Sequence, residues 1–192
     1  MGSADRPRLG VIVASVRDAR VGHTLGEWVE ARVREHQGFD VDVIDLAEVA
    51  LPMTTSEPHH PRTGQYVNES TKAWSARIAA CQAFVIVTPE YNYGMPAPLK
   101  NALDLVSTEW NYKPVAFASY GGISGGLRSV EHAKQVVLPL RMVPILESVV
   151  APMVFEQIAD GVFTPNEVQQ GAVKQMLDEL SRVTAALRPL QG

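Results

Sequence analysis

Three polar loops in this sequence carry the side chains that could bind a ligand or take part in chemistry. Residues 89–92 bring a proline, an acid, a tyrosine and an amide together, which a plain connector would not need. Residues 15–22 combine a hydroxyl group with two arginines, and residues 120–126 contain four glycines. A single loop of this kind is often an ordinary surface turn, so a functional interpretation depends on whether the three meet in space.

The loop at residues 15–22 has the groups that bind a phosphate. Ser15 supplies a hydroxyl and Arg17 and Arg20 supply cations. Gly22 lets the backbone come close, just before a helix whose first amides are free and at the positive end of its dipole. No Gly-Lys-Ser/Thr sequence follows, so a terminal monophosphate fits better than a nucleoside triphosphate. The alternative is a pair of surface arginines near a helix start.

The glycine-rich loop does not match a dinucleotide fingerprint. Ile123 stands where Gly-x-Gly-x-x-Gly requires its second glycine, and the loop follows the fourth predicted strand rather than the first. Its backbone could still lie flat against a planar ring and direct amides at the ring's carbonyl oxygens. The alternative is a flexible helix start that Ser124 caps.

The elements around these loops predict a parallel α/β sheet. Short apolar runs typical of strands buried on both faces alternate with apolar residues at helical spacing, and one alternating run is typical of a sheet edge. The predicted strands are residues 9–14, 39–46 at the edge, 83–87, 114–118, and 143–145 with 148–150. The predicted helices are residues 25–37, 67–81, 99–106, 127–137 and 164–187. The last helix is expected to open with a capping box of Thr164 and Glu167.

Five strands alternating with five helices favour a doubly wound sheet in the order 2-1-3-4-5, with helices on both faces. In that order the loops after strands 1, 3 and 4 share one edge of the sheet. They are also the three loops with the most unusual composition. This coincidence favours a ligand site over three unrelated turns.

Composition limits the class of protein. The chain of 192 residues predicts a single domain over residues 1–192, with residues 1–7 disordered. The net charge of −4 argues against a nucleic-acid partner. The single cysteine, Cys81, excludes an intramolecular disulfide and is expected to be a buried structural thiol.

Two further features are expected to carry no site. The adjacent His59 and His60 lie in a proline-rich connector (residues 51–65) without a third ligand at useful spacing, so no metal is predicted. No apolar run is long enough to span a bilayer and the N-terminus lacks a signal-peptide core, so no membrane partner and a cytoplasmic location are expected. The long connector itself is more often functional than accidental.

The motifs together resemble a known family. Thr-Pro-Glu-Tyr-Asn through Pro-Leu-Lys-Asn-Ala-Leu-Asp (residues 88–104), Tyr-Gly-Gly-Ile-Ser-Gly-Gly (residues 120–126) and Ser-Val-Arg with Arg20 and Gly22 resemble the NADPH-dependent FMN reductase family. That family has the flavodoxin-like fold and includes quinone, azo-dye and chromate reductases. The resemblance covers about residues 9–187. It implies an FMN-binding domain, NADPH or NADH as co-substrate, a small-molecule electron acceptor, and a homodimer or homotetramer.

The resemblance also implies which residues hold the cofactor. The first loop would hold the FMN phosphate through Ser15, Arg17, Arg20, Val21 and Gly22. The other two loops would hold the isoalloxazine ring through Pro89, Glu90, Tyr91 and Asn92 on one side and Tyr120, Gly121 and Gly122 on another. Many members carry Ser-x-Arg-x-x-Ser-x-Asn in the first loop, whereas this chain follows a related Arg-x-x-Arg-x-Gly version.

The implied mechanism is ping-pong: NAD(P)H passes a hydride to the flavin and leaves, and an acceptor is then reduced in the same place. The acceptor would be a flavin, a quinone, an azo dye or a metal oxyanion. No catalytic side chain is needed. Amides near Gly121 and Gly122 would stabilise negative charge on the reduced ring, and Glu90 is expected to accept hydrogen bonds from loop amides. Two alternatives are open: an FMN-binding electron carrier or redox sensor without NAD(P)H turnover, and a flavin-free interaction module.

Overall fold

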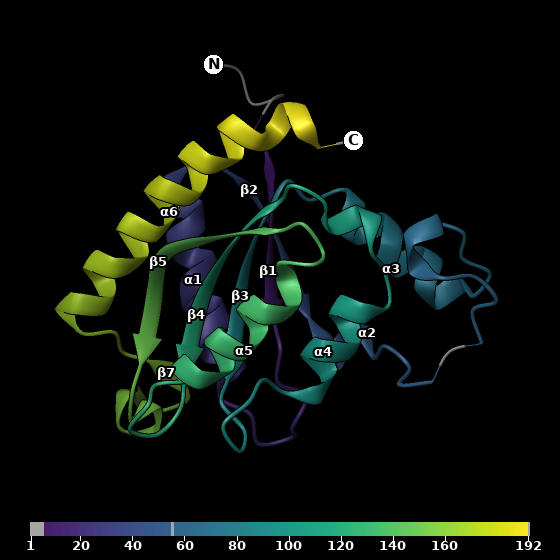
Figure 1. The fold of residues 1–192 in the computed structure, drawn as a ribbon. Coiled ribbons are helices and arrows are strands. Elements are labelled where there is room, and N and C mark those ends of the chain that lie inside the picture. The colour runs from purple at the N-terminus through teal and green to yellow at the C-terminus, as the bar shows by residue number, and fades with distance from the viewer. Residues whose placement is uncertain (1–5, 55, 192) are drawn as a thin grey trace.

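The computed structural model describes residues 6–54 and 56–191. Within them, five strands form one parallel sheet in the order β2-β1-β3-β4-β5, as predicted (Figure 1). The strands are β1 (Arg8–Val13), β2 (Asp40–Asp45), β3 (Ala83–Pro89), β4 (Pro114–Tyr120) and β5 (Val143–Ala151). The crossovers therefore place the carboxyl ends of all five strands at one edge.

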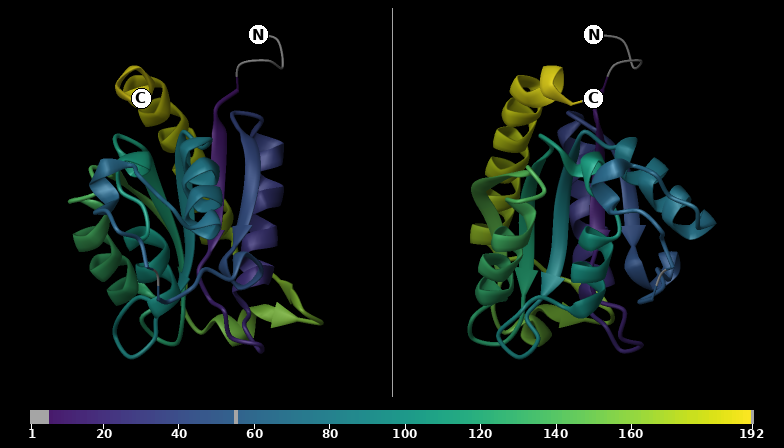
Figure 2. Two further views of the ribbon diagram at one scale, coloured as in Figure 1. Left: turned by 90° about the vertical axis from the view of Figure 1, so that its right-hand side faces the viewer. Right: turned by 45° about the vertical axis from the view of Figure 1, so that its right-hand side comes forward.

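Helices cover both faces of the sheet (Figure 2). α1 (Gly22–His36) and α6 (Glu167–Leu187) pack on one face, and α3 (Glu69–Ala79), α4 (Ala97–Asp104) and α5 (Leu127–Val137) pack on the other. A short α2 (Leu46–Val49) follows β2 directly. The helices thus enclose the sheet in two layers and leave its carboxyl edge to the loops.

Each face of the sheet has its own core because successive strand residues point to opposite sides. In β3, Phe84 and Ile86 join the core under α3, α4 and α5, whereas Val85 and Val87 join the core under α1 and α6. β3 is buried along its whole length, while β2 at the edge is only partly buried in its first half. The two kinds of strand pattern therefore have the burial that the sequence predicted.

The start of α6 differs from the prediction. Asn166, not Thr164, is the N-cap, and it forms the capping box with Gln169 through two hydrogen bonds of 2.9 Å. A hairpin of β6 (Ile158–Ala159) and β7 (Val162–Phe163), which the sequence did not predict, precedes the helix. The Thr164 amide donates to the carbonyl of Gln157 (2.7 Å), so the chain is still extended there and the helix begins later.

Hydrogen bonds to Glu57 stabilise the conformation of the connector between α2 and α3. The Glu57 carboxylate accepts from the amides of Val67 (2.7 Å) and Asn68 (3.0 Å). Desolvation would raise the pKa of this carboxyl, but the hydrogen bonds from Val67, Thr71 and Asn68 outweigh it and lower the pKa to about 2. A turn of 3₁₀ helix, η2 (Pro61–Thr63), lies within the connector.

Several sequence expectations concern the rest of the chain. Cys81 is fully buried, as predicted. Of the segment expected to be disordered, residues 1–5 lie outside the described residues, and the Pro7 carbonyl accepts a hydrogen bond from the Asp40 amide (3.0 Å). Across residues 6–54 and 56–191, no helix has the length and hydropathy to cross a bilayer, and no group of three or more His, Cys, Asp or Glu side chains could hold a metal.

Candidate functional site

The three polar loops meet at the carboxyl edge of the sheet, which is the lower rim in Figure 1. The β1–α1 loop touches the β3–α4 turn at two points: Ser15 Oγ lies 2.6 Å from Tyr91 Oη, and the guanidinium carbon of Arg17 lies 3.6 Å from the centroid of the Tyr91 ring. The Glu90 amide donates to the Tyr120 carbonyl (3.2 Å) at the start of the β4–α5 loop. The predicted convergence is therefore confirmed.

The β3–α4 turn has a strained backbone. Tyr91 and Gly94 exchange two hydrogen bonds of 3.0 Å across a two-residue turn. Both central residues have positive φ, 49° for Asn92 and 70° for Tyr93, a combination that usually calls for Asn and Gly. Such strain concentrates at binding sites and persists only where the surroundings hold it. Here Tyr91 points to the β1–α1 loop, while Tyr93 as a residue is 72% exposed.

The Glu90 carboxylate joins this turn to the β4–α5 loop. Its Oε2 accepts from Ser124 Oγ (2.9 Å) and the Arg128 amide (3.1 Å), and its Oε1 accepts from Arg128 Nε (2.5 Å) and forms an ion pair with Nη2. Desolvation would raise the pKa of the Glu90 carboxyl, but the hydrogen bonds from Arg128 and Ser124 lower it. Glu90 is thus a structural acceptor, as expected, with an arginine partner that sequence reasoning missed.

Ser124 does not cap α5, contrary to the alternative considered from the sequence. The N-cap is Gly126, whose φ of 88° suits glycine. A Cβ on Gly126 would lie 2.8 Å from the Tyr120 amide nitrogen and carbonyl oxygen. Because the helix begins only at Leu127, the Ser124 hydroxyl is free to donate to Glu90.

Two buried polar atoms near the start of α1 have no hydrogen-bond partner among the described residues, one on Arg20 of the β1–α1 loop and one on Tyr120 of β4. Arg20 Nη2 donates to Asp45 Oδ2 (2.7 Å), but its buried Nε has no hydrogen-bond partner among the described residues. Val21 is the N-cap of α1 and makes no side-chain cap. Tyr120 Oη is buried and likewise lacks a partner in the described part of the chain, and a Cβ on Gly22 would lie 2.4 Å from it. Burial, together with neighbouring Tyr91, raises the pKa of Tyr120.

The glycine loop corrects one expectation. The Gly121 amide donates to the Ala151 carbonyl (3.2 Å), which continues the β4–β5 pairing, so this amide is not directed at a ligand. The Gly121 and Gly122 carbonyls accept from the amides of Val154 (3.1 Å) and Met153 (2.9 Å). A Cβ on Gly122 would meet nothing within 4 Å, so the space beside Gly122 is open.

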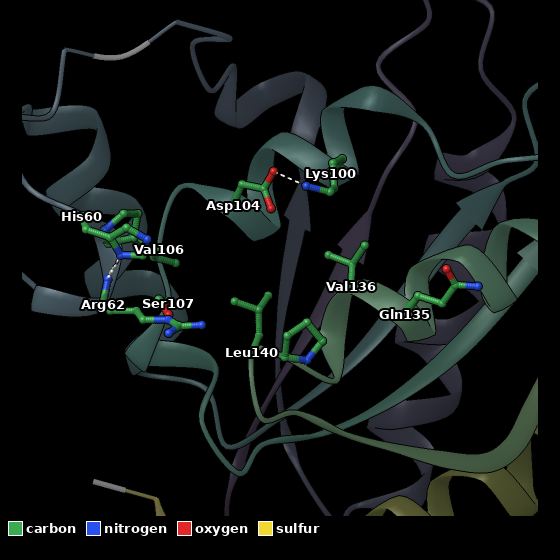
Figure 3. Close-up of a pocket in the computed structure, with 11 residues that line it drawn as sticks. His60, Arg62, Lys100, Asp104, Val106, Ser107, Gln135, Val136 and Leu140 are labelled. Atoms are coloured by element: carbon green, nitrogen blue, oxygen red, sulfur yellow. Dashed lines mark hydrogen bonds and ion pairs between the residues drawn. The ribbon is translucent and has the colours of Figure 1, made fainter.

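Two hollows differ in their relation to these loops. One of about 590 Å³ lies between the β1–α1 loop, α2 and the start of α4, and Val16, Asp18 and Arg20 line one wall. Another of about 440 Å³ lies between η2 and the ends of α4 and α5 and is lined by none of the predicted site residues (Figure 3). Its Lys100 is paired with Asp104. The first hollow therefore lies beside the β1–α1 loop, where Arg20 lines it, and no residue of the segments 89–92 and 120–126 is part of its wall.

The residues at the edge fit an anion beside a flat ring. Ser15, Arg17 and the unpaired Nε of Arg20 supply donors and positive charge near the N-terminus of α1. The buried hydroxyl of Tyr120, which has no partner among the described residues, packs against Gly22 at the same place. Tyr93, which is exposed, and Gly122, beside which the space is open, lie at the rim.

Known proteins are similar to this chain in sequence and in fold. The sequence profile described as NADPH-dependent FMN reductase matches residues 7–156. An NAD(P)H-dependent FMN reductase of Schizosaccharomyces pombe is 40% identical over 163 residues, 83% of this chain and 80% of that protein. A probable NADPH:quinone oxidoreductase of Oryza sativa is 31% identical over 196 residues, 97% of each chain. The flavoenzyme NAD(P)H:(acceptor) oxidoreductase FerB of Paracoccus denitrificans has the same fold, with a TM-score of 0.72, 22% identity, and coverage of 94% of this chain and 98% of that one.

Proposed function

This chain belongs to the NADPH-dependent FMN reductase family, and we propose that its three polar loops hold FMN at the carboxyl edge of the sheet. It is an FMN-dependent NAD(P)H oxidoreductase with the flavodoxin-like fold. The observation that carries the proposed site is the double contact of Tyr91 with Ser15 and Arg17. It joins the β1–α1 loop, proposed to hold the phosphate, to the β3–α4 turn, proposed to hold the ring. The whole chain, residues 1–192, is proposed to be one such domain.

The phosphate of FMN is proposed to lie against Ser15, Arg17, Arg20, Val21 and Gly22. The support is chemical, because charge-assisted hydrogen bonds from guanidinium groups and free amides at a helix N-terminus are what a phosphate needs. Arg17 and Arg20 already have fixed positions through the Tyr91 ring and Asp45. Little side-chain entropy is then lost on binding.

The isoalloxazine ring is proposed to lie between two further groups of residues. These are Pro89, Glu90, Tyr91 and Asn92 on the β3–α4 turn, and Tyr120, Gly121 and Gly122 on the β4–α5 loop. The chemistry that FMN supplies when bound is two-electron transfer from NAD(P)H to an acceptor. The side chains of the site bind and orient, and Glu90 acts on loop conformation through Arg128 and Ser124.

The acceptor is a small molecule, and we propose a quinone, a flavin or an azo dye. Similarity to NADPH:quinone oxidoreductases and to an NADPH azoreductase supports these classes. Exposed apolar side chains beside the rim, Tyr93, Ile123 and Phe155, offer surface for a planar acceptor or for a second subunit. A homodimer or homotetramer in the cytoplasm completes the proposal.

The visible spectrum of the purified protein tests this function most directly. We expect bound flavin that is released as FMN, and NADPH oxidation that menadione accelerates. Colourless protein that takes up no FMN and oxidises no NADPH would refute the function. FMN binding without NADPH oxidation would instead indicate an electron carrier or redox sensor.

A further inference from the structure

We propose that Arg128 is a positioning residue that locks the β3–α4 turn to the β4–α5 loop and thereby preforms the two walls of the ring site. The lock itself is a property of the protein without ligand. Its consequence for flavin binding rests on the proposed function.

Arg128 and Glu90 form an ion pair that joins the two loops. Arg128, in the first turn of α5, contacts Glu90 with its amide, its Nε and its Nη2, while Ser124 donates to the same carboxylate. The Glu90 side chain is only 6% exposed, whereas the Arg128 side chain is 47% exposed. A carboxylate that is nearly buried needs such partners, because leaving it unpaired is costly. Arg128 is therefore the main partner that permits Glu90 to face inward.

Arg128 also contacts the strained part of the turn. The guanidinium carbon of Arg128 lies 3.7 Å from the centroid of the Tyr93 ring. Tyr93 has a φ of 70°, a conformation that a tyrosine adopts only when its surroundings hold it. Arg128 thus contacts the turn on both sides of Asn92, at Glu90 before it and at Tyr93 after it.

The Arg128 lock completes a closed set of contacts between the two loops. The Glu90 amide donates to the Tyr120 carbonyl, and Tyr120 leads directly into the glycine loop that ends at α5. Backbone pairing on one side and the Arg128 ion pair on the other therefore fix the distance between the loops. Lysine could not replace arginine here, because an ammonium group cannot direct two donors at the Glu90 carboxylate and at the same time stack a planar face on the Tyr93 ring.

Three single variants, one double variant and one control test the lock. Arg128→Gln removes the charge, Arg128→Lys retains it, and Glu90→Gln keeps the shape of the acceptor. Arg182→Gln is the matched control, because Arg182 pairs with Glu179 on the surface of α6. Amide hydrogen exchange in the flavin-free protein measures how often the turn opens, and fluorescence titration measures the FMN dissociation constant.

We expect the Tyr91 and Gly94 amides to exchange about tenfold or more faster in Arg128→Gln than in the wild type, because those amides bond only across the turn. FMN binding is expected to weaken about ten- to a hundredfold, with Arg128→Lys close to Arg128→Gln. The double variant Arg128→Gln/Glu90→Gln should bind FMN no worse than whichever single variant binds it more weakly, since each substitution removes the same ion pair. Arg182→Gln should match the wild type in both measurements.

Unchanged exchange at Tyr91 and Gly94 in Arg128→Gln would overturn the proposal, and so would full rescue by lysine. A uniform rise in exchange throughout the protein would also overturn it, because it would indicate a general stability role. Wild-type protein that binds no FMN would refute the proposed function, and the exchange of these two amides would still decide whether Arg128 locks the turn.

Discussion

Replacing Gly22 with alanine would place a methyl group where the start of α1 meets Tyr120. The new Cβ would lie 2.4 Å from Tyr120 Oη and 3.1 Å from its Cζ. Neither partner moves freely, because Tyr120 is buried at the end of β4 and Gly22 opens a helix packed on the sheet. The substitution must therefore displace the ring or the first turn of α1.

Overpacking of this kind costs about 1–3 kcal/mol of stability. The higher helix propensity of alanine offsets up to about 1 kcal/mol, and less at a first helical position. We therefore expect Gly22→Ala to lower the free energy of unfolding by about 1–2 kcal/mol. FMN binding is expected to weaken about tenfold or more, since the first turn of α1 and its free amides would move away from the phosphate.

Urea unfolding of the flavin-free protein and titration with FMN measure the two effects. Gly171→Ala on α6 is the control, because a Cβ there meets nothing within 4 Å, and it is expected to raise stability by about 0.5–1 kcal/mol. Adding Tyr120→Phe to Gly22→Ala removes the closest clashing atom and should restore most of the lost stability. The reasoning is refuted if Gly22→Ala is as stable as the wild type, or if Tyr120→Phe brings no recovery.

Three further outcomes are expected. Arg17→Ala should weaken FMN binding by roughly 1.5–3 kcal/mol, the strength of a charge-assisted contact, while Arg34→Ala, which removes a surface pair on α1, should not change the titration. The free energy of unfolding should rise between pH 8 and pH 9, by at most about 1.4 kcal/mol, because burial lowers the pKa of Lys113 to about 8 and the unfolded chain then binds more protons. Urea unfolding at both pH values should show this rise in the wild type and not in Lys113→Met. The rise should end above pH 9, because burial raises the pKa of Cys81 to about 11 and the folded thiol keeps a proton that the unfolded chain loses. Glu57→Ala should speed tryptic cleavage of the connector between α2 and α3, and an unchanged rate would show that Glu57 does not hold the connector.

Local errors in the sequence interpretation have a common cause. The capping box moved from Thr164 to Asn166 because a hairpin, whose strands have two residues each, delays the helix. Ser124 is not the cap because α5 begins only at Leu127, and the Ser124 hydroxyl bonds to a carboxylate from another loop instead. The Gly121 amide donates a hydrogen bond to the Ala151 carbonyl of the neighbouring strand. In each case a tertiary partner competed with the local pattern.

The order of the strands and the position of the three loops could be predicted from the sequence, because apolar runs, helical spacing and right-handed crossovers leave few arrangements open. The pairing of Glu90 with Arg128, and of Arg20 with Asp45, could not. These contacts join residues 38 and 25 positions apart, and the choice among possible partners depends on distances that exist only after folding. Local periodicity thus determined which loops share the sheet edge, and packing between distant segments decided which of their polar atoms are already bonded and which, such as Arg20 Nε and Tyr120 Oη, have no partner among the described residues.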